Sequence, residues 1–206
     1  MSAELIQGSD EWFAARCGRV TASRIADIIA KTKTGESASR GNYRAQLVAE
    51  RLTGKPADSF SNAAMQWGTD TEPYARIAYE ARTGIMVQEV GFIAHTIIAY
   101  AGASPDGLAD DGLVEIKCPN TATHIDYFLA GVAPEKYKPQ MAWQCACTGR
   151  SWVDFVSFDP RLPEGMQLMV NRYTPEPEYI QMLESEVVRF IGEVELLIDQ
   201  LLKRAA

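Results

Sequence analysis

Apolar residues recur every three or four positions in several stretches of the chain, as they do on one face of a helix. In residues 21–31 they are Ile25, Ile28 and Ile29, and this spacing predicts a helix capped by Thr21. Residues 31–40 are rich in Lys, Thr, Ser and Gly, which is typical of a mobile basic loop. Similar apolar spacing predicts further helices over residues 42–52, 70–83, 121–129, 134–148 and 178–203.

Several of these predicted helices carry recognisable end signals. The helix over residues 42–52 stops before Gly54, and the helix over residues 70–83 carries Pro73 in its first turn and ends at Gly84. In the last helix, over residues 178–203, apolar residues repeat about every 3.5 positions. A coiled coil has the same repeat, but a helix that packs on its own domain also produces it and is the favoured interpretation.

Three short apolar runs, at residues 86–94, 99–104 and 113–118, are separated by Gly, Pro and Asp, which predicts strands joined by turns. Residues 152–158 alternate, with Trp152, Asp154, Val156 and Phe158 on one side of a predicted strand. Residues 167–173 predict another strand. The order of helices, three strands, helices, strands and a final helix favours an α/β domain around a small mixed β-sheet flanked by helices.

The composition suits one globular domain over residues 1–206. Hydrophobic residues make up 47% of the chain, and no run approaches the ~18 apolar residues of a membrane span. The first ten residues lack the basic and apolar regions of a signal peptide, so we expect a cytoplasmic protein. The four cysteines, at 17, 118, 145 and 147, lack the spacing of a zinc or iron–sulfur site and are expected to be reduced thiols.

The net charge is −7, but it is unevenly distributed. Between residues 16 and 55 there are nine Lys or Arg against three acidic residues, so this segment carries +6. Solvated helix faces are one interpretation of such a cluster. The other interpretation is a surface that faces phosphates. It is favoured because the acidic residues described next form a candidate metal centre that would act on phosphates.

Asp106 precedes Gly107 at a predicted turn between two strands, and Glu115 and Lys117 follow on the next strand. Two residues that are two positions apart leave a strand on the same face, whereas Ile116 points to the opposite face, into the core. A hairpin would bring Asp106 beside Glu115, giving two oxygen ligands for Mg²⁺ and a lysine next to the metal-bound water. The main-chain carbonyl of Ile116 could supply a further ligand.

This arrangement suits the hydrolysis of a phosphodiester. A bound metal polarises the phosphoryl oxygen and lowers the pKa of a bound water, and the lysine ammonium offsets the negative charge that grows on the phosphate. Each feature alone has an ordinary explanation, since an Asp-Gly pair is usually only a turn and a Glu-x-Lys is usually a solvated strand face. Their occurrence on adjacent strands favours the catalytic interpretation.

The chain also resembles a known family, the phage lambda exonuclease and YqaJ-type viral recombinases, whose catalytic core is written PD-(D/E)xK. The residues that carry the resemblance occur in five blocks: Ser-Pro-Asp-Gly at 104–107 with Val-Glu-Ile-Lys-Cys-Pro at 114–119, Trp12 with Arg-Cys-Gly-Arg-Val-Thr-Ala-Ser at 16–23, Trp-Gly-Thr-Asp-Thr-Glu at 67–72, Pro-Gln-Met-Ala-Trp-Gln at 139–144, and Phe-Asp-Pro-Arg at 158–161. The family usually has Gln-x-Gln in the fourth block, whereas this chain has Gln140-Met141-Ala142.

The resemblance implies a restriction-endonuclease-like core, over about residues 67–160, and a 5′-to-3′ exonuclease. It would degrade one strand of double-stranded DNA from its ends, releasing mononucleotides and leaving a 3′ overhang for recombination by strand annealing. The implied cofactor is Mg²⁺, with two ions per site and Mn²⁺ as a substitute. The implied partners are DNA ends, two further copies of the chain in a homotrimer, and a single-strand annealing protein.

The resemblance also assigns roles to individual residues. Asp106 and Glu115 would bind the metals with the Ile116 carbonyl, Lys117 would assist the attacking water, and the remaining catalytic positions would be Glu72 and Gln140. Positions that hold a terminal 5′-phosphate correspond to Arg16, Ser23 and Ser104. Met65 lies where the family places an apolar residue that wedges between base pairs, and packing in the core is the alternative. Lys33 lies in the basic loop, where it is either a contact to the DNA backbone or a solvated lysine.

Three alternatives remain open at the sequence level. A restriction-type endonuclease uses the same metal core, since fold alone does not decide the substrate. A degenerate relative could bind DNA ends without cutting them, although the catalytic positions are all present here. An acidic interaction protein without nucleic acid would leave the +6 segment unexplained.

Overall fold

Helices and strands alternate along the computed structural model, which describes residues 6–33, 35–57 and 62–206. Within these residues the helices are α1 (Asp10–Arg16), α2 (Ile25–Ile29), α3 (Ala38–Thr53), α4 (Ala63–Thr83), α5 (Thr121–Ala130), α6 (Lys138–Thr148) and α7 (Pro177–Ala205), with 3₁₀ turns η1 (Ala22–Arg24), η2 (Glu135–Tyr137) and η3 (Glu164–Met166). The strands are β1 (Val20–Thr21), β2 (Lys31–Thr32), β3 (Gly35–Glu36), β4 (Val87–Gln88), β5 (Ile93–Ala94), β6 (Ala101–Ala103), β7 (Gly107–Ala109), β8 (Gly112–Lys117), β9 (Val153–Phe158) and β10 (Leu168–Tyr173).

The largest sheet is mixed and has five strands in the order β10-β9-β8-β7-β4. Its central strands β8 and β9 are parallel, with Leu113 opposite Val153, whereas the other neighbours are antiparallel. A parallel pair needs a crossover connection, and α5 and α6 lie between the two strands in the chain. The α/β class and the small mixed sheet predicted from the sequence are therefore confirmed.

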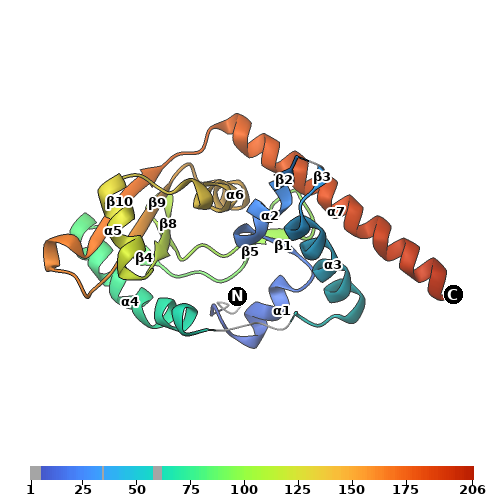
Figure 1. Cartoon of the computed structure of the whole chain (residues 1–206), viewed down its shortest axis with the longest axis horizontal. Coiled ribbons are helices and arrows are strands. Elements are labelled where there is room, and N and C mark those ends of the chain that lie inside the picture. Colours follow the sequence, from blue (N-terminus) through green and yellow to red (C-terminus); the bar gives the residue numbers. More distant parts are fainter. Residues whose placement is uncertain (1–5, 34, 58–61) are drawn as a thin grey trace.

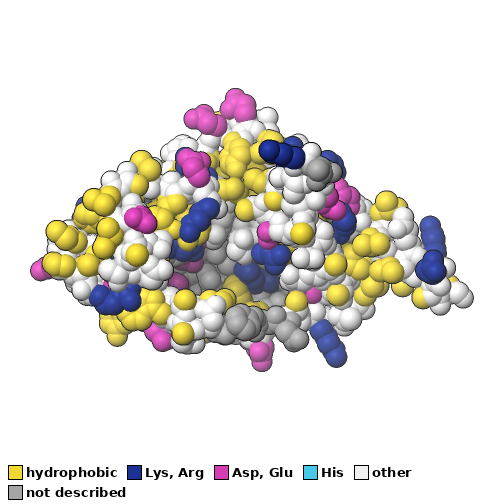
Figure 2. Space-filling model, in the orientation of Figure 1, with side chains coloured by type: hydrophobic (Ala, Val, Ile, Leu, Met, Phe, Trp, Pro, Cys, Tyr) yellow, Lys and Arg dark blue, Asp and Glu magenta, His cyan; other side chains and the backbone are white. Residues whose placement is uncertain are grey.

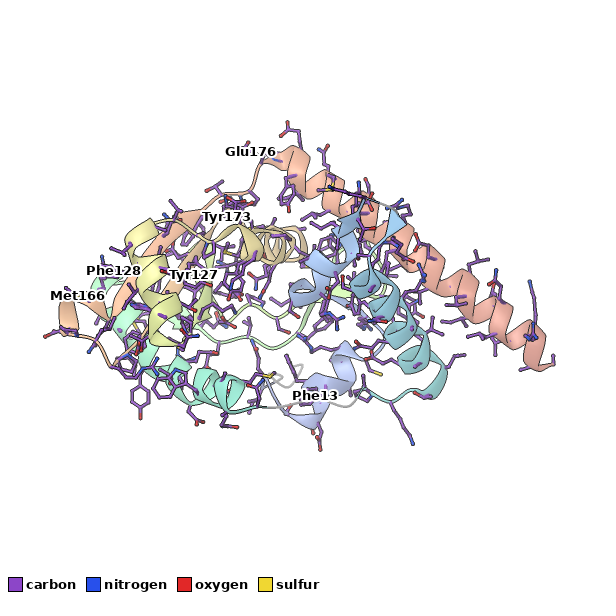
Figure 3. The ribbon with its side chains drawn as sticks, viewed as in Figure 1. Phe13, Tyr127, Phe128, Met166, Tyr173 and Glu176 are labelled. Carbon is purple, nitrogen blue, oxygen red and sulfur yellow. The ribbon has the colours of Figure 1, made fainter. Side chains whose placement is uncertain are left out.

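Helices cover both faces of the central strands (Figure 1). On one face, Ala75 and Tyr79 of α4 pack with Val156 and Phe158, and on the other, Met141 and Cys145 of α6 join a cluster that includes Phe155. Tyr127 of α5, labelled in Figure 3, packs edge-on against Phe155 with ring centroids 5.8 Å apart. All six residues of β9 are consequently buried. The two sides of the alternating sequence were predicted correctly, because Trp152, Val156 and Phe158 pack in one cluster and Val153 and Phe155 pack in the other.

A second core lies beside this sheet. It surrounds the three-stranded sheet β1-β6-β5 and contains Ile25 and Ile28 of α2, Leu47 of α3 and Phe190 of α7, all almost fully buried. Trp143 of α6 belongs to this second cluster, and its indole N–H donates to the Gly102 carbonyl at 3.2 Å. Helix α6 therefore contacts both cores and connects them.

Two predictions of local structure at the N-terminal side were wrong. Residues 31–40 are not all loop: they include the β2–β3 strand pair, and α3 begins at Ala38 because Ser37 caps it by accepting from the Arg40 N–H at 3.2 Å. Thr21 does not cap a helix with its side chain. Its backbone belongs to β1, which pairs with β6, and the helix starts only after the η1 turn.

Helix α4 is longer than predicted and changes the position of Pro73. It begins at Ala63, where the Asn62 side chain accepts from the Met65 N–H at 2.9 Å, so Pro73 lies inside the helix and not in its first turn. The predicted C-terminal ends are confirmed, since Gly54 and Gly84 take positive φ angles of 65° and 74°.

Helix α7 extends past the rest of the ribbon in Figure 1, at the end of the chain. Its N-terminal half packs into the second core through Leu183, Val187 and Phe190, whereas Leu201 and Leu202 are exposed. Within the described residues, no helix combines the length and the apolar character needed to cross a membrane.

Candidate active site

The predicted catalytic aspartate lies where the chain passes from one sheet to the other. Strand β6 belongs to the three-stranded sheet and β7 to the five-stranded sheet, so Ser104, Pro105 and Asp106 form the crossing. Asp106 lies at a bend between two strands, as predicted, but these are β6 and β7, and the β7–β8 hairpin turn is at residues 110 and 111. Asp106 immediately precedes β7.

Gly107 is required here by close packing. A Cβ atom at this position would lie 2.1 Å from Cγ1 of Val87 in the neighbouring strand β4. Any larger residue would push β4 away and shift the hairpin that carries Asp106.

Strand β8 continues past the end of its pairing with β7. The pairing covers residues 112–114, so beyond it Glu115, Ile116 and Lys117 pair with β9 on one side only. On the other side, the main-chain N–H of Ile116 donates to Oδ2 of Asp106 at 2.6 Å. The N–H and C=O of one strand residue point the same way, so the Ile116 carbonyl faces the Asp106 side as well.

Glu115 is fully buried and is held by two glutamines from α6. Gln140 Nε2 donates to Glu115 Oε1 at 2.5 Å, and Gln144 Nε2 donates to Glu115 Oε2 at 2.6 Å. The Lys117 ammonium forms an ion pair with Oε1 of the same carboxylate. Ile116 packs in the cluster on the opposite face of the sheet, as its alternation with Glu115 predicted.

The carboxylates crowd one another electrostatically. Burial raises the pKa of Asp106 well above its ordinary value, the nearby Glu115 raises it further, and Lys117 opposes both. Burial likewise raises the pKa of Glu72, which projects from α4 and interacts with the charges of Lys117 and Glu115. Burial alone would lower the pKa of Lys117, but Glu115 and Asp106 raise it above its ordinary value, so the lysine stays charged.

This donor set fits a hard divalent cation. Within the described residues, no three His, Cys, Asp or Glu side chains form a group that could hold a metal ion by themselves. Mg²⁺ does not need such a cage, because it is commonly held by one or two carboxylates and completes its shell with water and substrate phosphate. Asp106, Glu115 and the Ile116 carbonyl supply oxygen donors of this kind.

An arginine–serine pair lies close to Asp106, because Ser104 precedes the aspartate by two positions in the chain. The guanidinium of Arg16 donates to Ser104 Oγ at 3.0 Å, and the indole N–H of Trp12 donates to the same oxygen at 3.0 Å. The Arg16 guanidinium also stacks over the Trp12 ring, 4.0 Å from its centroid. Burial lowers the pKa of Arg16, but a guanidinium remains charged at neutral pH.

Arg16 also lines a cavity of about 280 Å³ between α1, β1 and α3. Ser23, which is exposed, Arg19 and Arg24 line the same cavity. Figure 2 shows Lys and Arg side chains around the hollow near the centre of the molecule. Of the three residues predicted to hold a terminal phosphate, Arg16 therefore shares this cavity with Ser23 and donates a hydrogen bond to Ser104.

Much of the basic segment between residues 16 and 55 is used within the fold. Arg40 donates two hydrogen bonds to Glu193 of α7, at 2.6 and 2.9 Å, and both Arg40 and Arg44 pair with Glu36. Arg24 pairs with Asp27 at 2.5 Å. The interpretation of the whole segment as a phosphate-facing surface was therefore too broad.

The structure does not join Lys33 and Met65 to the residues described above. Lys33 is exposed between β2 and β3, and no hydrogen bond or ion pair within the described residues links it to Asp106 or Arg16. Met65 lies in the first turn of α4 with 54% of its surface exposed. Its exposure is compatible with a contact to DNA bases, which stays a prediction.

Sequence reasoning placed Gln144 and Trp12 in the family blocks but assigned a role in the site to neither. Gln144 lies four positions after Gln140, so the two face the same side of α6, and this spacing was a usable signal. Ala142, where the family usually has its second glutamine, is instead buried in the second core. Nothing in the local pattern around Trp12 indicated that its indole would reach Ser104.

The fold and the site thus define a mixed α/β protein whose carboxylate–lysine centre adjoins an arginine–serine pair. Residues 11–151 match the YqaJ-like viral recombinase domain, and the chain belongs to this family. No curated protein matched the chain.

Solved structures similar to this chain carry exonuclease names. The crystal structure of LHK-Exo in complex with dAMP is 51% identical, has a TM-score of 0.90, and the match covers 96% of this chain and 98% of that one. The structure of LHK-Exo from Laribacter hongkongensis, an alkaline exonuclease, is 50% identical with a TM-score of 0.89 and the same coverage. A phage-related exonuclease from Haemophilus somnus 129PT is 15% identical with a TM-score of 0.67 over 91% of this chain and 96% of that one, and so shares the fold alone.

Proposed function

We propose that this chain is a Mg²⁺-dependent exonuclease that degrades one strand of double-stranded DNA from its 5′ end. The observation that carries the proposal is the Ser104-Pro105-Asp106 segment, which joins an arginine–serine pair to a carboxylate–lysine centre. Two residues span at most about 7 Å of chain. A terminal phosphate held by Arg16 and Ser104 therefore lies close to Asp106, a placement that favours cutting near a strand end.

Asp106, Glu115 and the Ile116 carbonyl would hold the metal. When bound, Mg²⁺ would polarise the scissile phosphate and lower the pKa of the attacking water. Lys117 reaches Glu115 Oε1 from the same strand face, so its ammonium can offset the negative charge that develops on the phosphate. Gln140 donates into the same oxygen from α6, where its amide can orient the water or the phosphate. Glu72 adds a third negative charge to the centre.

The end of the strand would be recognised by charge and hydrogen bonding. The Arg16 guanidinium offers a fork of donors that matches phosphate oxygens, and the hydroxyls of Ser23 and Ser104 fill remaining positions. The relative LHK-Exo was crystallised with dAMP, a mononucleotide, which supports release of single nucleotides as the product. A terminal hydroxyl would lack these contacts, so a 5′-phosphate should be preferred.

We further propose that the chain acts in recombination by strand annealing, as a cytoplasmic enzyme, and that Mn²⁺ substitutes for Mg²⁺ with two ions per site. Membership of the viral recombinase family supports a single-strand annealing protein as partner. A homotrimer around the duplex is proposed by resemblance to the family.

A single experiment tests the main proposal. Linear duplex DNA with a 5′-phosphate and a label near one 5′ end is incubated with the protein and Mg²⁺, in parallel with an EDTA control and a closed circular duplex. Early release of labelled mononucleotides, an intact circle and no reaction in EDTA are expected.

The other outcomes separate the alternatives. Cutting of the circle would indicate a restriction-type endonuclease, which the same metal centre could support. Binding of DNA ends without cleavage in either Mg²⁺ or Mn²⁺ would indicate an inactive end-binding protein. Release of the label only after most of the labelled strand has been degraded would reverse the proposed polarity.

A further inference from the structure

Gln144 contacts the candidate metal centre through its side-chain amide nitrogen alone. It is fully buried in α6, and its Nε2 donates to Oε2 of Glu115 at 2.6 Å. Gln140, one turn earlier, is only half-buried and donates to the other oxygen, Oε1. The two glutamines thus contact opposite oxygens of one carboxylate, but only Gln140 reaches the open side of the site.

The burial of Gln144 carries a cost within the fold. Within the described residues, its Oε1 is buried and has no hydrogen-bond partner. An unsatisfied buried acceptor destabilises a fold by about 1–3 kcal/mol. When a buried acceptor is left unpaired beside a candidate active site, we expect the glutamine to be retained because its amide nitrogen has a role there.

The amide nitrogen of Gln144 fixes the direction of the Glu115 carboxylate. The terminal torsion of a glutamate is intrinsically broad, so the carboxylate needs partners to hold one orientation. With Oε2 held by Gln144 inside the protein, Oε1 is the oxygen that meets the Lys117 ammonium. Both partners of Oε1, Gln140 and Lys117, are partly exposed, whereas Gln144, the partner of Oε2, is fully buried, so Oε1 is the oxygen on the open side of the site.

We propose that Gln144 is a positioning residue that makes Glu115 a one-oxygen metal ligand through Oε1. The inference rests on the proposed metal-dependent function and goes beyond it, because it assigns a role to a residue that cannot touch the substrate. Partners that orient metal ligands typically contribute 10–100-fold in metal affinity, although they never touch the metal.

The test measures metal binding without DNA. Mn²⁺ is titrated calorimetrically into the wild-type chain and into Gln144→Met, which keeps the side-chain length but removes the donor. Mn²⁺ affinity is expected to fall by roughly 10–100-fold. The Mg²⁺ concentration for half-maximal nuclease rate should rise by a similar factor, with most of the rate recovered at saturating Mg²⁺.

Two further variants keep the test decisive. Gln144→Asn retains an amide but is shorter by one carbon, about 1.5 Å, and should bind Mn²⁺ weakly even if Gln144→Met does not fold. Cys145→Ala disturbs the packing of the next residue on α6, which contacts the Phe155 cluster and not Glu115. It should keep the wild-type Mn²⁺ affinity.

The outcomes are distinct. Wild-type affinity in both Gln144 variants, or an equal loss in Cys145→Ala, would overturn the positioning role while the proposed function stood. A wild-type protein that bound no Mn²⁺ and cleaved no DNA would overturn the proposed function itself, and the inference with it.

Discussion

At the scale of single residues, the carboxylates of Asp106 and Glu115 are each held by a neighbour from another part of the chain. The backbone of β8 donates to Asp106, and α6 donates to both oxygens of Glu115. Neither acid is therefore free to turn away, which is the condition for a pre-organised site. Changing one charge while keeping its hydrogen bond should separate chemistry from structure.

Asp106→Asn makes this separation. The asparagine amide oxygen can still accept from the Ile116 N–H, but the charge that would attract a metal is lost. We expect the rate of DNA cleavage to fall by roughly 10³-fold or more, with an unchanged circular dichroism spectrum. Asp111→Asn is the matched control, because Asp111 accepts from the Trp152 indole at the other end of the hairpin. Full activity of Asp106→Asn would refute the proposed metal site.

Arg16→Gln tests the recognition of the strand end. A charged hydrogen bond contributes about 1.5–3 kcal/mol, so the preference for a 5′-phosphate over a 5′-hydroxyl should fall by roughly 10–100-fold. The measurement is the ratio of cleavage rates on the two substrates. Arg189→Gln removes the same charge from an exposed position on α7 and should leave the ratio unchanged. An unaltered ratio in Arg16→Gln would place the phosphate elsewhere.

At the scale of secondary-structure elements, α3 and α7 are connected by a charged pair. Arg40 of α3 is 7% exposed, donates to the Ile28 carbonyl at 3.0 Å and makes two hydrogen bonds to Glu193 of α7. Its guanidinium also stacks over Phe190, 4.9 Å from the ring centroid. These contacts make Arg40 a structural residue, so its charge is not available to bind phosphate.

Arg40→Met should therefore affect stability more than DNA binding. Breaking a buried pair costs about 3–5 kcal/mol, and the partial exposure of Glu193 reduces this to about 2–3 kcal/mol of unfolding free energy. Urea denaturation measures the loss, and Arg189→Met, which breaks an exposed pair with Glu186, should change stability by less than about 0.5 kcal/mol. A large loss of DNA affinity with unchanged stability would restore the phosphate-binding interpretation of Arg40.

Helix α6 carries a cysteine thiol whose pKa depends on burial. Burial raises the pKa of the Cys145 thiol to about 12, whereas an unfolded cysteine titrates near pH ~8.5. The folded state therefore keeps the thiol protonated, and this contribution to stability is fully present below about pH 8.5 and is lost as the pH rises toward 12. Cys147 and Cys118 are shifted in the same direction, also first by burial.

The expected result is a steeper alkaline loss of stability in the wild type than in Cys145→Ala. One such thiol changes the unfolding free energy by up to about 1.4 kcal/mol per pH unit within this window. Urea denaturation at several values between pH 7 and 11 measures the slope. Comparing slopes removes the constant penalty of the small cavity in the variant. Parallel slopes would mean that the Cys145 thiol titrates alike in the folded and unfolded protein, so that burial does not raise its pKa.

At the scale of the whole molecule, an acidic protein carries a basic cavity. The chain has a net charge of −7, yet Arg16, Arg19 and Arg24 line one cavity beside the candidate active site. Negative charge over the rest of the surface would repel DNA from it, so the cavity would be the favourable place of contact. Charge distribution and not total charge therefore decides where a nucleic acid can bind.

The proposed homotrimer can be tested on the molecule as a whole. Sedimentation equilibrium should give a mass of about 68 kDa, three times the 22.7 kDa of the chain. The trimer should bind linear DNA, because a ring can be threaded onto a free end. A closed circular duplex should be a poor competitor for this binding. A mass of about 23 kDa at micromolar concentration would exclude the ring.

The sequence by itself determined the structural features that depend only on residues close together in the chain. Strand alternation placed Glu115 and Lys117 on one face and Ile116 in the core, and glycines marked the ends of α3 and α4. These features follow from the fixed geometry of the chain over a few residues. The same local reasoning failed where the partner was distant, as it did for Thr21, whose backbone belongs to a sheet with β6.

Only the tertiary structure decided which distant groups meet. Arg40 and Glu193 are 153 positions apart, and Gln144 reaches Glu115 from a different element, so no local pattern could pair them. Charge counting could not distinguish Arg40, which is neutralised inside the fold, from Arg16, which lines the cavity. The reason is physical: the preferences of each residue fix the elements, whereas the packing of elements against a common core selects the contacts between them.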